Sequence, residues 1–182
     1  MADVFIVGDG PGGLSAALFL AKNGHDVTVF GQDQTAVNYA YLYNYLGIPE
    51  ISGPDFQQAA RRQVESFGAV IRDVEAESVT AEADGVTVTA GGDTARADYL
   101  ILTEGKDPVL ARSLGLAEEN GRIRVDAEMR SSNDRVYVVG RSVRPNRSQA
   151  IISAGDGAKA ALDILAREAG KDVQDWDTPP KD

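Results

Sequence analysis

The glycine-rich segment near the N-terminus has the residue types and the spacing of a phosphate-binding turn. Gly8, Gly10 and Gly13 form a GxGxxG pattern between an apolar run at 4–7 and a small-residue stretch at 14–21. In this setting the first glycine permits a tight turn, the second lets the backbone approach a pyrophosphate, and the third lets helix and strand pack closely. The helix would also aim free N–H groups and a partial positive charge at the phosphates. The pattern predicts a dinucleotide site, and a glycine-rich turn without a ligand is the alternative.

Asp33 is the candidate for the acidic residue that usually bonds the adenosine ribose at the end of the second strand. Residues 27–30 have the apolar character of that strand, which would complete a βαβ unit. Asp33 lies 20 residues after Gly13, so its spacing permits this role, but two residues, Gly31 and Gln32, separate it from the expected strand end. A turn aspartate is the alternative interpretation.

Arg141, Arg144 and Arg147 form a local positive cluster just before the last predicted helix. Like charges at one helix end favour a nearby phosphate or another anion, and a solubilising surface is the alternative. Because the chain as a whole is acidic, this cluster is a candidate anion site.

Four tyrosines occupy the alternate positions 39, 41, 43 and 45. Alternation places them on one face, and tyrosine suits interfaces because it combines an apolar body with a polar tip. We expect a dimer interface or a core face here, with a ring-stacking pocket as the alternative.

The elements that must position these residues follow an α/β order. Buried strands are predicted at 4–7, 27–30, 97–103 and 136–139, and helices at 14–21, 54–67 and 148–168. Short strands near 69–74, 78–82 and 86–90, the last two joined by a hairpin turn at Asp84-Gly85, predict a small antiparallel meander. We expect a three-layer α/β Rossmann-like domain over residues 1–170, with a parallel sheet, helices and the meander, followed by a C-terminal tail at 171–182.

Composition excludes several kinds of site. The chain has 182 residues, no cysteine, one histidine, and 28 acidic against 18 basic side chains, for a formal charge of −10. No thiol chemistry or metal cluster is therefore expected, and the charge argues against nucleic acid as a partner. No apolar run approaches the ~20 residues that span a bilayer, so we expect no membrane partner and a cytoplasmic location. An acidic, lysine-poor composition is typical of halophilic cytoplasm, with an ordinary acidic protein as the alternative.

The order of motifs resembles the FAD domain of the low-molecular-weight thioredoxin reductase family, a branch of the two-dinucleotide-fold flavoproteins. The segments that carry the resemblance are 3–17, 43–54, 100–105, 123–140 and 148–158. The resemblance implies FAD as the cofactor, with the phosphates at Gly8, Gly10, Pro11, Gly12 and Gly13. It places Asn44 near the flavin and Val74 near the adenine. It also implies that Ser148, Gln149 and Ala150 begin a helix aimed at the flavin pyrimidine ring, with Arg147 at the same end.

Three departures from that family bear on function. Its members insert an NADPH-binding domain with a redox Cys-x-x-Cys pair between the halves of the FAD domain, but here Leu116 runs almost directly into Asn120 and no cysteine is present. Thioredoxin reduction by the family mechanism is thereby excluded. The family's glycine–aspartate pair, whose carboxylate holds the ribityl chain of FAD, reads Gly140-Arg141 here. Arg141 would either clamp the pyrophosphate or mark a change of ligand. The displaced strand-end acid is the third departure.

These observations leave two functions open. The first is a single-domain, thioredoxin reductase-like flavoprotein that binds FAD and works as an oxidoreductase with an external electron donor and a small-molecule or protein redox partner. The second is a non-catalytic nucleotide-binding module with a sensor or regulatory role. No side chain is assigned a catalytic role. A homodimer formed through the tyrosine segment is expected.

Overall fold

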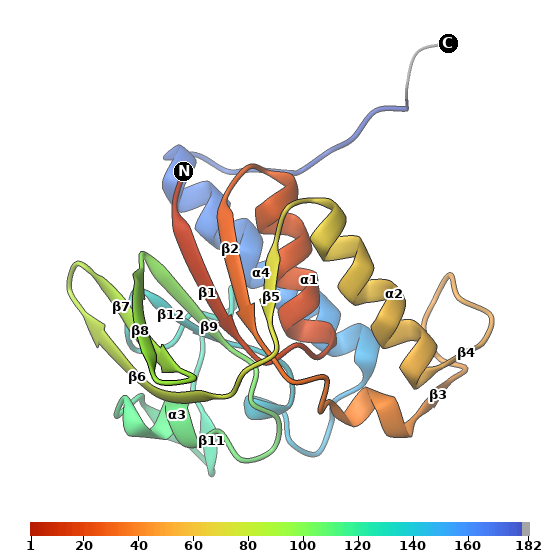
Figure 1. Ribbon diagram of the computed structural model, residues 1–182, viewed down its shortest axis with the longest axis horizontal. Coiled ribbons are helices and arrows are strands. Elements are labelled where there is room, and N and C mark those ends of the chain that lie inside the picture. Colours follow the sequence, from red (N-terminus) through yellow and green to blue (C-terminus); the bar gives the residue numbers. More distant parts are fainter. Residues whose placement is uncertain (180–182) are drawn as a thin grey trace.

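The computed structural model describes residues 1–179, and its centre is a five-stranded parallel sheet (Figure 1). The strands lie in the order β12-β9-β1-β2-β5. Their bounds are β1 Asp3–Val7, β2 Asp26–Phe30, β5 Val70–Arg72, β9 Tyr99–Leu102 and β12 Val136–Val138. From β1 the chain first adds β2 and β5 on one side of it and later adds β9 and β12 on the other side. The strand order therefore reverses between β1 and β9. In such sheets, ligands bind outside the carboxyl ends of the strands at this reversal.

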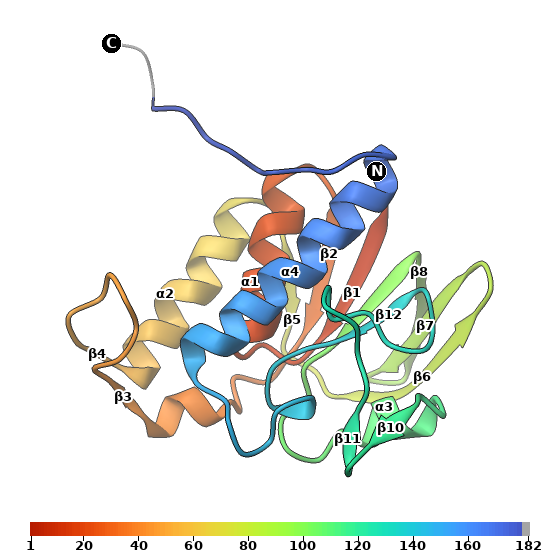
Figure 2. The ribbon, with the colours of Figure 1, turned by 180° about the vertical axis from the view of Figure 1, so that it is seen from behind.

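Helices cover one face of the sheet, as Figure 2 shows. They are α1 Pro11–Lys22, α2 Gly53–Ser66 and α4 Ala150–Ala169. The main hydrophobic core lies between these helices and the sheet. The helices α1 and α4 pack closely because glycines lie where they meet: a Cβ on Gly157 would be 2.0 Å from the carbonyl oxygen of Gly12.

An antiparallel sheet covers the other face of the parallel sheet. Its strands are β6 Ala76–Glu82, β7 Gly85–Ala90 and β8 Asp93–Ala97. A second apolar core fills the space between the two sheets. The predicted three-layer arrangement with a small meander is confirmed, but the strand predicted at 69–74 is β5 of the parallel sheet, and β8 is the third strand of the meander.

The strand predicted at 97–103 corresponds to β9 at 99–102, whereas Ala97 is the last residue of β8 in the antiparallel sheet. Asp98 separates the two strands. Its backbone N–H donates to the Asp3 carbonyl oxygen at 2.9 Å, and its carboxylate accepts from the Asp3 N–H at 2.9 Å. These two bonds turn the chain from β8 into β9 beside β1.

Short elements complete the chain. They are the 3-10 helices η1 Ala36–Tyr39 and η2 Gly140–Ser142, the helix α3 Val109–Ser113, and the strands β3 Tyr41–Leu42, β4 Ile51–Ser52, β10 Glu118–Glu119 and β11 Arg122–Ile123. After α4 the chain returns to α1, where Lys22 pairs with Asp175 at 3.0 Å. Among residues 1–179, no helix is long and apolar enough to cross a membrane.

The tyrosine segment is an exposed edge of the molecule. Tyr39 is 93% exposed and Tyr43 is 72% exposed, and the rings of Tyr41 and Tyr43 lie 4.9 Å apart. Tyr45 instead turns inward and packs on Phe56, with ring centroids at 5.2 Å. The face that carries the exposed tyrosines is therefore not packed into the core of this chain.

Candidate functional site

The glycine loop joins the end of β1 to the first turn of α1. Gly8 has a φ of +101°, and a Cβ on Gly13 would be 2.1 Å from the Gly8 carbonyl oxygen. Gly10 is the N-cap and offers no side-chain acceptor, Pro11 opens the helix, and the first helical bond runs from the Leu14 N–H to Gly10. The N–H groups of the first turn therefore remain free to meet an anion.

A groove of about 670 Å³ runs along the carboxyl ends of the parallel strands. The glycine loop, the residues that follow β2 and those that follow β9 line it. Among them are Gly8, Gly10, Gly31, Thr103 and Glu104, with Val74 also in the lining. The groove lies at the strand-order reversal, where a dinucleotide is expected.

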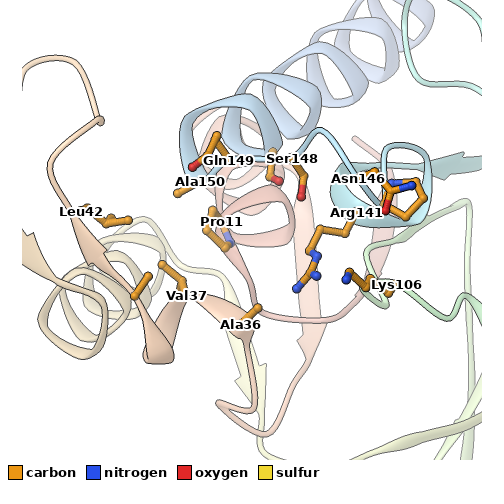
Figure 3. Close-up of a pocket in the computed structure, with 13 residues that line it drawn as sticks. Pro11, Ala36, Val37, Leu42, Lys106, Arg141, Asn146, Ser148, Gln149 and Ala150 are labelled. Carbon is orange, nitrogen blue, oxygen red and sulfur yellow. The ribbon is translucent and has the colours of Figure 1, made fainter.

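A second cavity of about 390 Å³ lies at the N-terminus of α4 (Figure 3). Its lining includes the predicted residues Pro11, Ser148, Gln149 and Ala150. Gln149 is the N-cap residue of α4, but its side chain makes no capping hydrogen bond. Free N–H groups are therefore available at this helix end too. Ala36, Arg141 and Ser153 line both the groove and this second cavity. The two spaces therefore adjoin one another.

Arg141 brings a positive charge to this junction, and Lys106 brings another to the second cavity. Figure 3 shows both side chains on the same side of the cavity, opposite Val37 and Leu42. Within residues 1–179, neither side chain takes part in an ion pair or a hydrogen bond. The junction and the second cavity thus present unpaired cationic donors, which suit phosphate or another anion.

Three further predicted residues, Gly12, Asn44 and Gly140, do not line either cavity. Asn44 is exposed, and its side-chain amide donates to Gln149 Oε1 at 3.1 Å, which ties the tyrosine segment to the start of α4. Gly12 is buried in the first turn of α1. Gly140, at a φ of +69°, donates its N–H to the Asp156 carboxylate at 3.3 Å.

The structure separates the three arginines that the sequence groups together. Arg141 faces the junction, Arg147 lines another cavity, and Arg144 forms an ion pair with the buried carboxylate of Asp156. Burial raises the pKa of Asp156, and the charge of Arg144 opposes that shift. The sequence pattern indicated an anion site but not that the loop divides its charges between two cavities.

Asp33 does not line the groove, although its neighbours Gln32 and Gln34 do. Its backbone has a φ of +56°, its N–H donates to Asp9 Oδ2 at 3.0 Å, and its carboxylate accepts from Asn38 at 3.1 Å. It lines a separate hollow together with Arg61. The side chain of Asp33 is therefore not part of the groove lining, and its role at the ribose stays a prediction.

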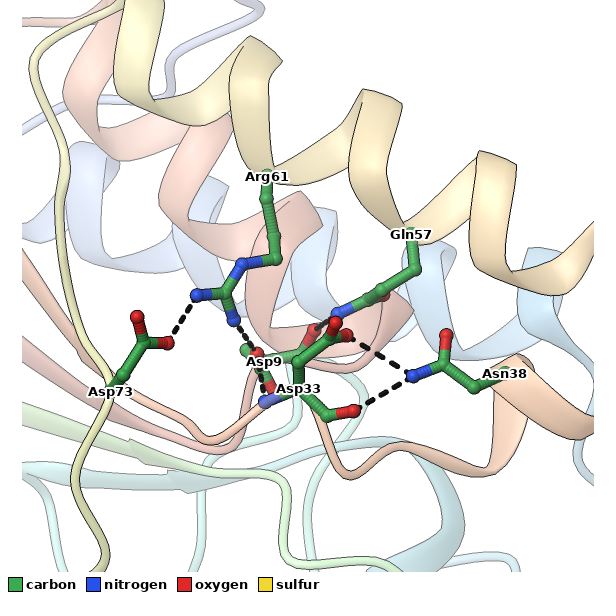
Figure 4. A network of polar contacts seen from close by, with 6 residues as sticks. All are labelled: Asp9, Asp33, Asn38, Gln57, Arg61 and Asp73. Atoms are coloured by element: carbon green, nitrogen blue, oxygen red, sulfur yellow. Dashed lines mark hydrogen bonds and ion pairs between the residues drawn. The ribbon is translucent and has the colours of Figure 1, made fainter.

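The sequence reasoning missed a polar network behind the glycine loop (Figure 4). The buried carboxylate of Asp9 pairs with Arg61 of α2, and Arg61 also pairs with Asp73. Gln57 Nε2 donates to the Asp9 carbonyl oxygen at 2.6 Å. Burial alone would lower the pKa of Arg61, but its bond to Asp73 and the charge of Asp9 raise it. Gln57, Arg61 and Val64 share one face of α2, and that spacing was the available signal.

Glu104 is a second missed residue. It follows β9 at the carboxyl edge of the sheet, and its carboxylate accepts the N–H groups of Leu110 at 2.7 Å and Ala111 at 3.0 Å. Burial raises the pKa of Glu104, and these two bonds oppose the shift. Its position directly after an apolar strand could have marked it as a groove residue.

A parallel sheet with a glycine loop at its strand-order reversal and two uncapped helix N-termini defines a dinucleotide-binding α/β domain. A family model described as pyridine nucleotide-disulphide oxidoreductase matches residues 2–55 and 44–157, and the chain belongs to that family. The chain is 30% identical over 174 residues to a thioredoxin reductase of Listeria monocytogenes, covering 93% of this chain and 51% of the relative. A Streptomyces coelicolor thioredoxin reductase is 31% identical, with 92% and 51% covered.

The chain therefore spans about half the length of the curated relatives it matches. Solved structures share the fold. A thioredoxin reductase from Gloeobacter violaceus aligns with a TM-score of 0.89 at 17% identity, over 97% of this chain and 99% of that chain. The atypical thioredoxin reductase TRi from Desulfovibrio vulgaris Hildenborough aligns at 0.85 and 17% identity, over 93% and 99%. The present sequence contains no cysteine, so a redox cysteine pair is absent from it.

Proposed function

We propose that this chain binds FAD and acts as a thioredoxin reductase-like oxidoreductase that receives electrons from an external donor. The observation that carries the proposal is that the groove and the second cavity adjoin at Arg141. Together they offer an extended site with a free helix N-terminus in each part. Such a site suits a long, doubly phosphorylated ligand with a ring system at each end.

The residues present fit this cofactor. Val74 would contact the adenine, and the first turn of α1 would bind the pyrophosphate through backbone N–H groups. Gln149 and Ala150 would lie against the flavin end, where the N-terminus of α4 favours negative charge. When bound, FAD supplies the electron-transfer chemistry, and the chain's own residues bind and orient it. Arg141, which cannot accept a hydrogen bond, would donate to a phosphate rather than hold a ribityl hydroxyl.

The proposal that the electron donor is a separate molecule rests on how the two halves of the domain are joined. The β10–β11 hairpin joins the two halves of the domain directly, without an inserted second dinucleotide fold. The proposal therefore includes a separate reductant and a small-molecule or protein redox partner, acting in the cytoplasm. A halophilic origin, supported by the charge of −10, is part of the proposal.

We also propose a homodimer through the tyrosine segment. Ala40 and Leu42 line the second cavity. The residues that alternate with them, Tyr39, Tyr41 and Tyr43, are exposed. Exposed aromatic side chains of this kind favour protein interfaces. The dimer would then lie next to the proposed flavin end of the site.

The test is an absorption spectrum of the purified protein, before and after incubation with FAD and removal of free cofactor. We expect the visible bands of a flavin, which dithionite bleaches. A protein that stays colourless after incubation with FAD would contradict the proposal.

The alternative is a nucleotide-binding module without catalysis. The guanidinium at position 141, in place of the family's carboxylate, favours it, as does the absence of cysteine. This function predicts that ADP binds with measurable heat while the FAD-treated protein reduces no artificial acceptor. Steady reduction of such an acceptor by the FAD-loaded protein would exclude the alternative.

A further inference from the structure

A cavity of about 670 Å³ outside the proposed FAD site is lined by four arginines and one carboxylate. Its lining residues come from the segment 119–125, which includes β11, and from the loop at 143–147, which leads toward α4. Its charged lining residues are Arg122, Arg124, Arg144, Arg147 and Glu119. This concentration of positive charge occurs in a chain whose formal charge is −10.

The local backbone explains how the arginines gather. Ile123 of β11 is buried in the core between the two sheets. The flanking residues Arg122 and Arg124 are exposed, and they line the cavity together with the edge of Ile123. Within residues 1–179, the side chains of Arg122, Arg124 and Arg147 have no ion pair, whereas Arg144 is paired with the buried Asp156. Three guanidinium groups thus remain free at one cavity.

The chemistry of the lining selects a class of ligand. Each guanidinium carries five N–H donors in a planar fork that matches phosphate oxygens, and it has no acceptor. Asn120 and Asn146 add amide groups, and Val125 and Val143 add apolar surface. A volume of this size is that of a small-molecule pocket rather than of a flat protein interface.

We propose that this cavity binds a small phosphorylated polyanion, such as pyrophosphate or the phosphates of a nucleotide, through Arg122, Arg124 and Arg147. The site is separate from the FAD groove. It shares only Pro145 and Asn146 with the second cavity, so the loop at 143–147 is the wall between them. Binding here does not require FAD, and the proposal holds whether or not the chain is a flavoprotein.

The experiment is a titration of the ¹⁵N-labelled full chain with inorganic pyrophosphate, followed by amide chemical shifts. We expect saturable shifts at residues 119–125 and 143–147. In the double variant Arg122→Gln/Arg124→Gln the affinity should fall at least about tenfold, since two charge-assisted contacts are lost. Both side chains are exposed, so the variant should fold, which circular dichroism verifies.

The matched control is Arg62→Gln, which removes an exposed arginine on α2 far from this cavity in the lining of another hollow. Its pyrophosphate affinity should equal that of the unchanged chain. Shifts confined to the glycine loop at 8–13, or an equal loss of affinity in both variants, would overturn the proposal. So would binding of polyglutamate at the arginines without binding of pyrophosphate, because that result would assign the surface to an acidic protein.

Discussion

The Asp9 carboxylate and the Arg61 guanidinium form an ion pair directly behind the glycine loop, and only 5% and 17% of the two side chains are exposed. Arg61 comes from the middle of α2, 52 residues along the chain from Asp9. The pair therefore connects the phosphate-binding loop to a helix that does not itself line the groove. Its second contact, to Asp73, continues the connection to the segment after β5.

Removing the guanidinium should destabilise the fold. In Arg61→Gln the buried Asp9 carboxylate loses its main partner, and breaking such a pair costs about 3 kcal/mol. Urea unfolding followed by circular dichroism measures the change. Arg62→Gln, at the exposed neighbouring position, should change the free energy of unfolding by less than about 0.5 kcal/mol. An equal, small effect of the two substitutions would show that the Asp9–Arg61 pair contributes little.

Two glycines of α4 should respond oppositely to alanine. A Cβ at Gly157 would be 2.0 Å from the Gly12 carbonyl oxygen, whereas a Cβ at Gly155 meets nothing within 4 Å. Gly157→Ala must push α4 away from α1, and we expect a loss of about 1–3 kcal/mol or more. Gly155→Ala should raise the free energy of unfolding by about 0.5–1 kcal/mol through helix propensity. Thermal unfolding of the pair checks this, and stabilisation by both would contradict the close packing.

The sequence predicted the parts of the site that local patterns define. The apolar run before Gly8 is typical of a strand covered on both faces. Gly13 is required by a close contact with Gly8, only five positions away. The orientation of Asp33 and of Arg147 could not be predicted in this way. A single positive φ turns Asp33 out of the groove, and the wall formed by the loop at 143–147 directs Arg147 to another cavity. The Asp9–Arg61 pair depends on tertiary packing, which spacing does not encode.

The buried carboxylate of Glu104 should make stability depend on pH. Burial raises the pKa of Glu104 above its ordinary value of 4.5. Between that value and the raised pKa the native state holds the proton more firmly than the unfolded chain, so stability falls as pH rises through this window and levels off above it. Glu104→Gln removes this pH-dependent loss because the amide does not ionise, although its single oxygen can accept from only one of the Leu110 and Ala111 N–H groups, which now bond to separate carboxylate oxygens. Urea midpoints of both proteins from pH 4 to pH 8 measure the difference, and parallel curves would contradict it.

The exposed tyrosines should control the oligomeric state. Tyr39 and Tyr43 bury little surface within the chain, so Tyr39→Ser/Tyr43→Ser should leave its fold unchanged. If they form the dimer interface, sedimentation equilibrium in molar salt should give twice the chain mass for the unchanged protein and the chain mass for the variant. A monomer in the unchanged protein under these conditions would exclude the dimer.

Arg141 should set both the affinity for FAD and its dependence on salt, if the proposed cofactor binds. A guanidinium at the junction of the two cavities would contact a phosphate through a charge-assisted bond, and its loss in Arg141→Gln should weaken FAD binding about tenfold. The affinity of the variant should also fall less between 0.1 M and 1 M salt, because one screened attraction is missing. Quenching of flavin fluorescence measures both quantities, with Arg62→Gln as the control. Arg141→Asp restores the carboxylate of the related reductases and should bind FAD more weakly still, since it places negative charge beside the phosphates. Tighter binding by Arg141→Asp would instead assign this position to the ribityl hydroxyls.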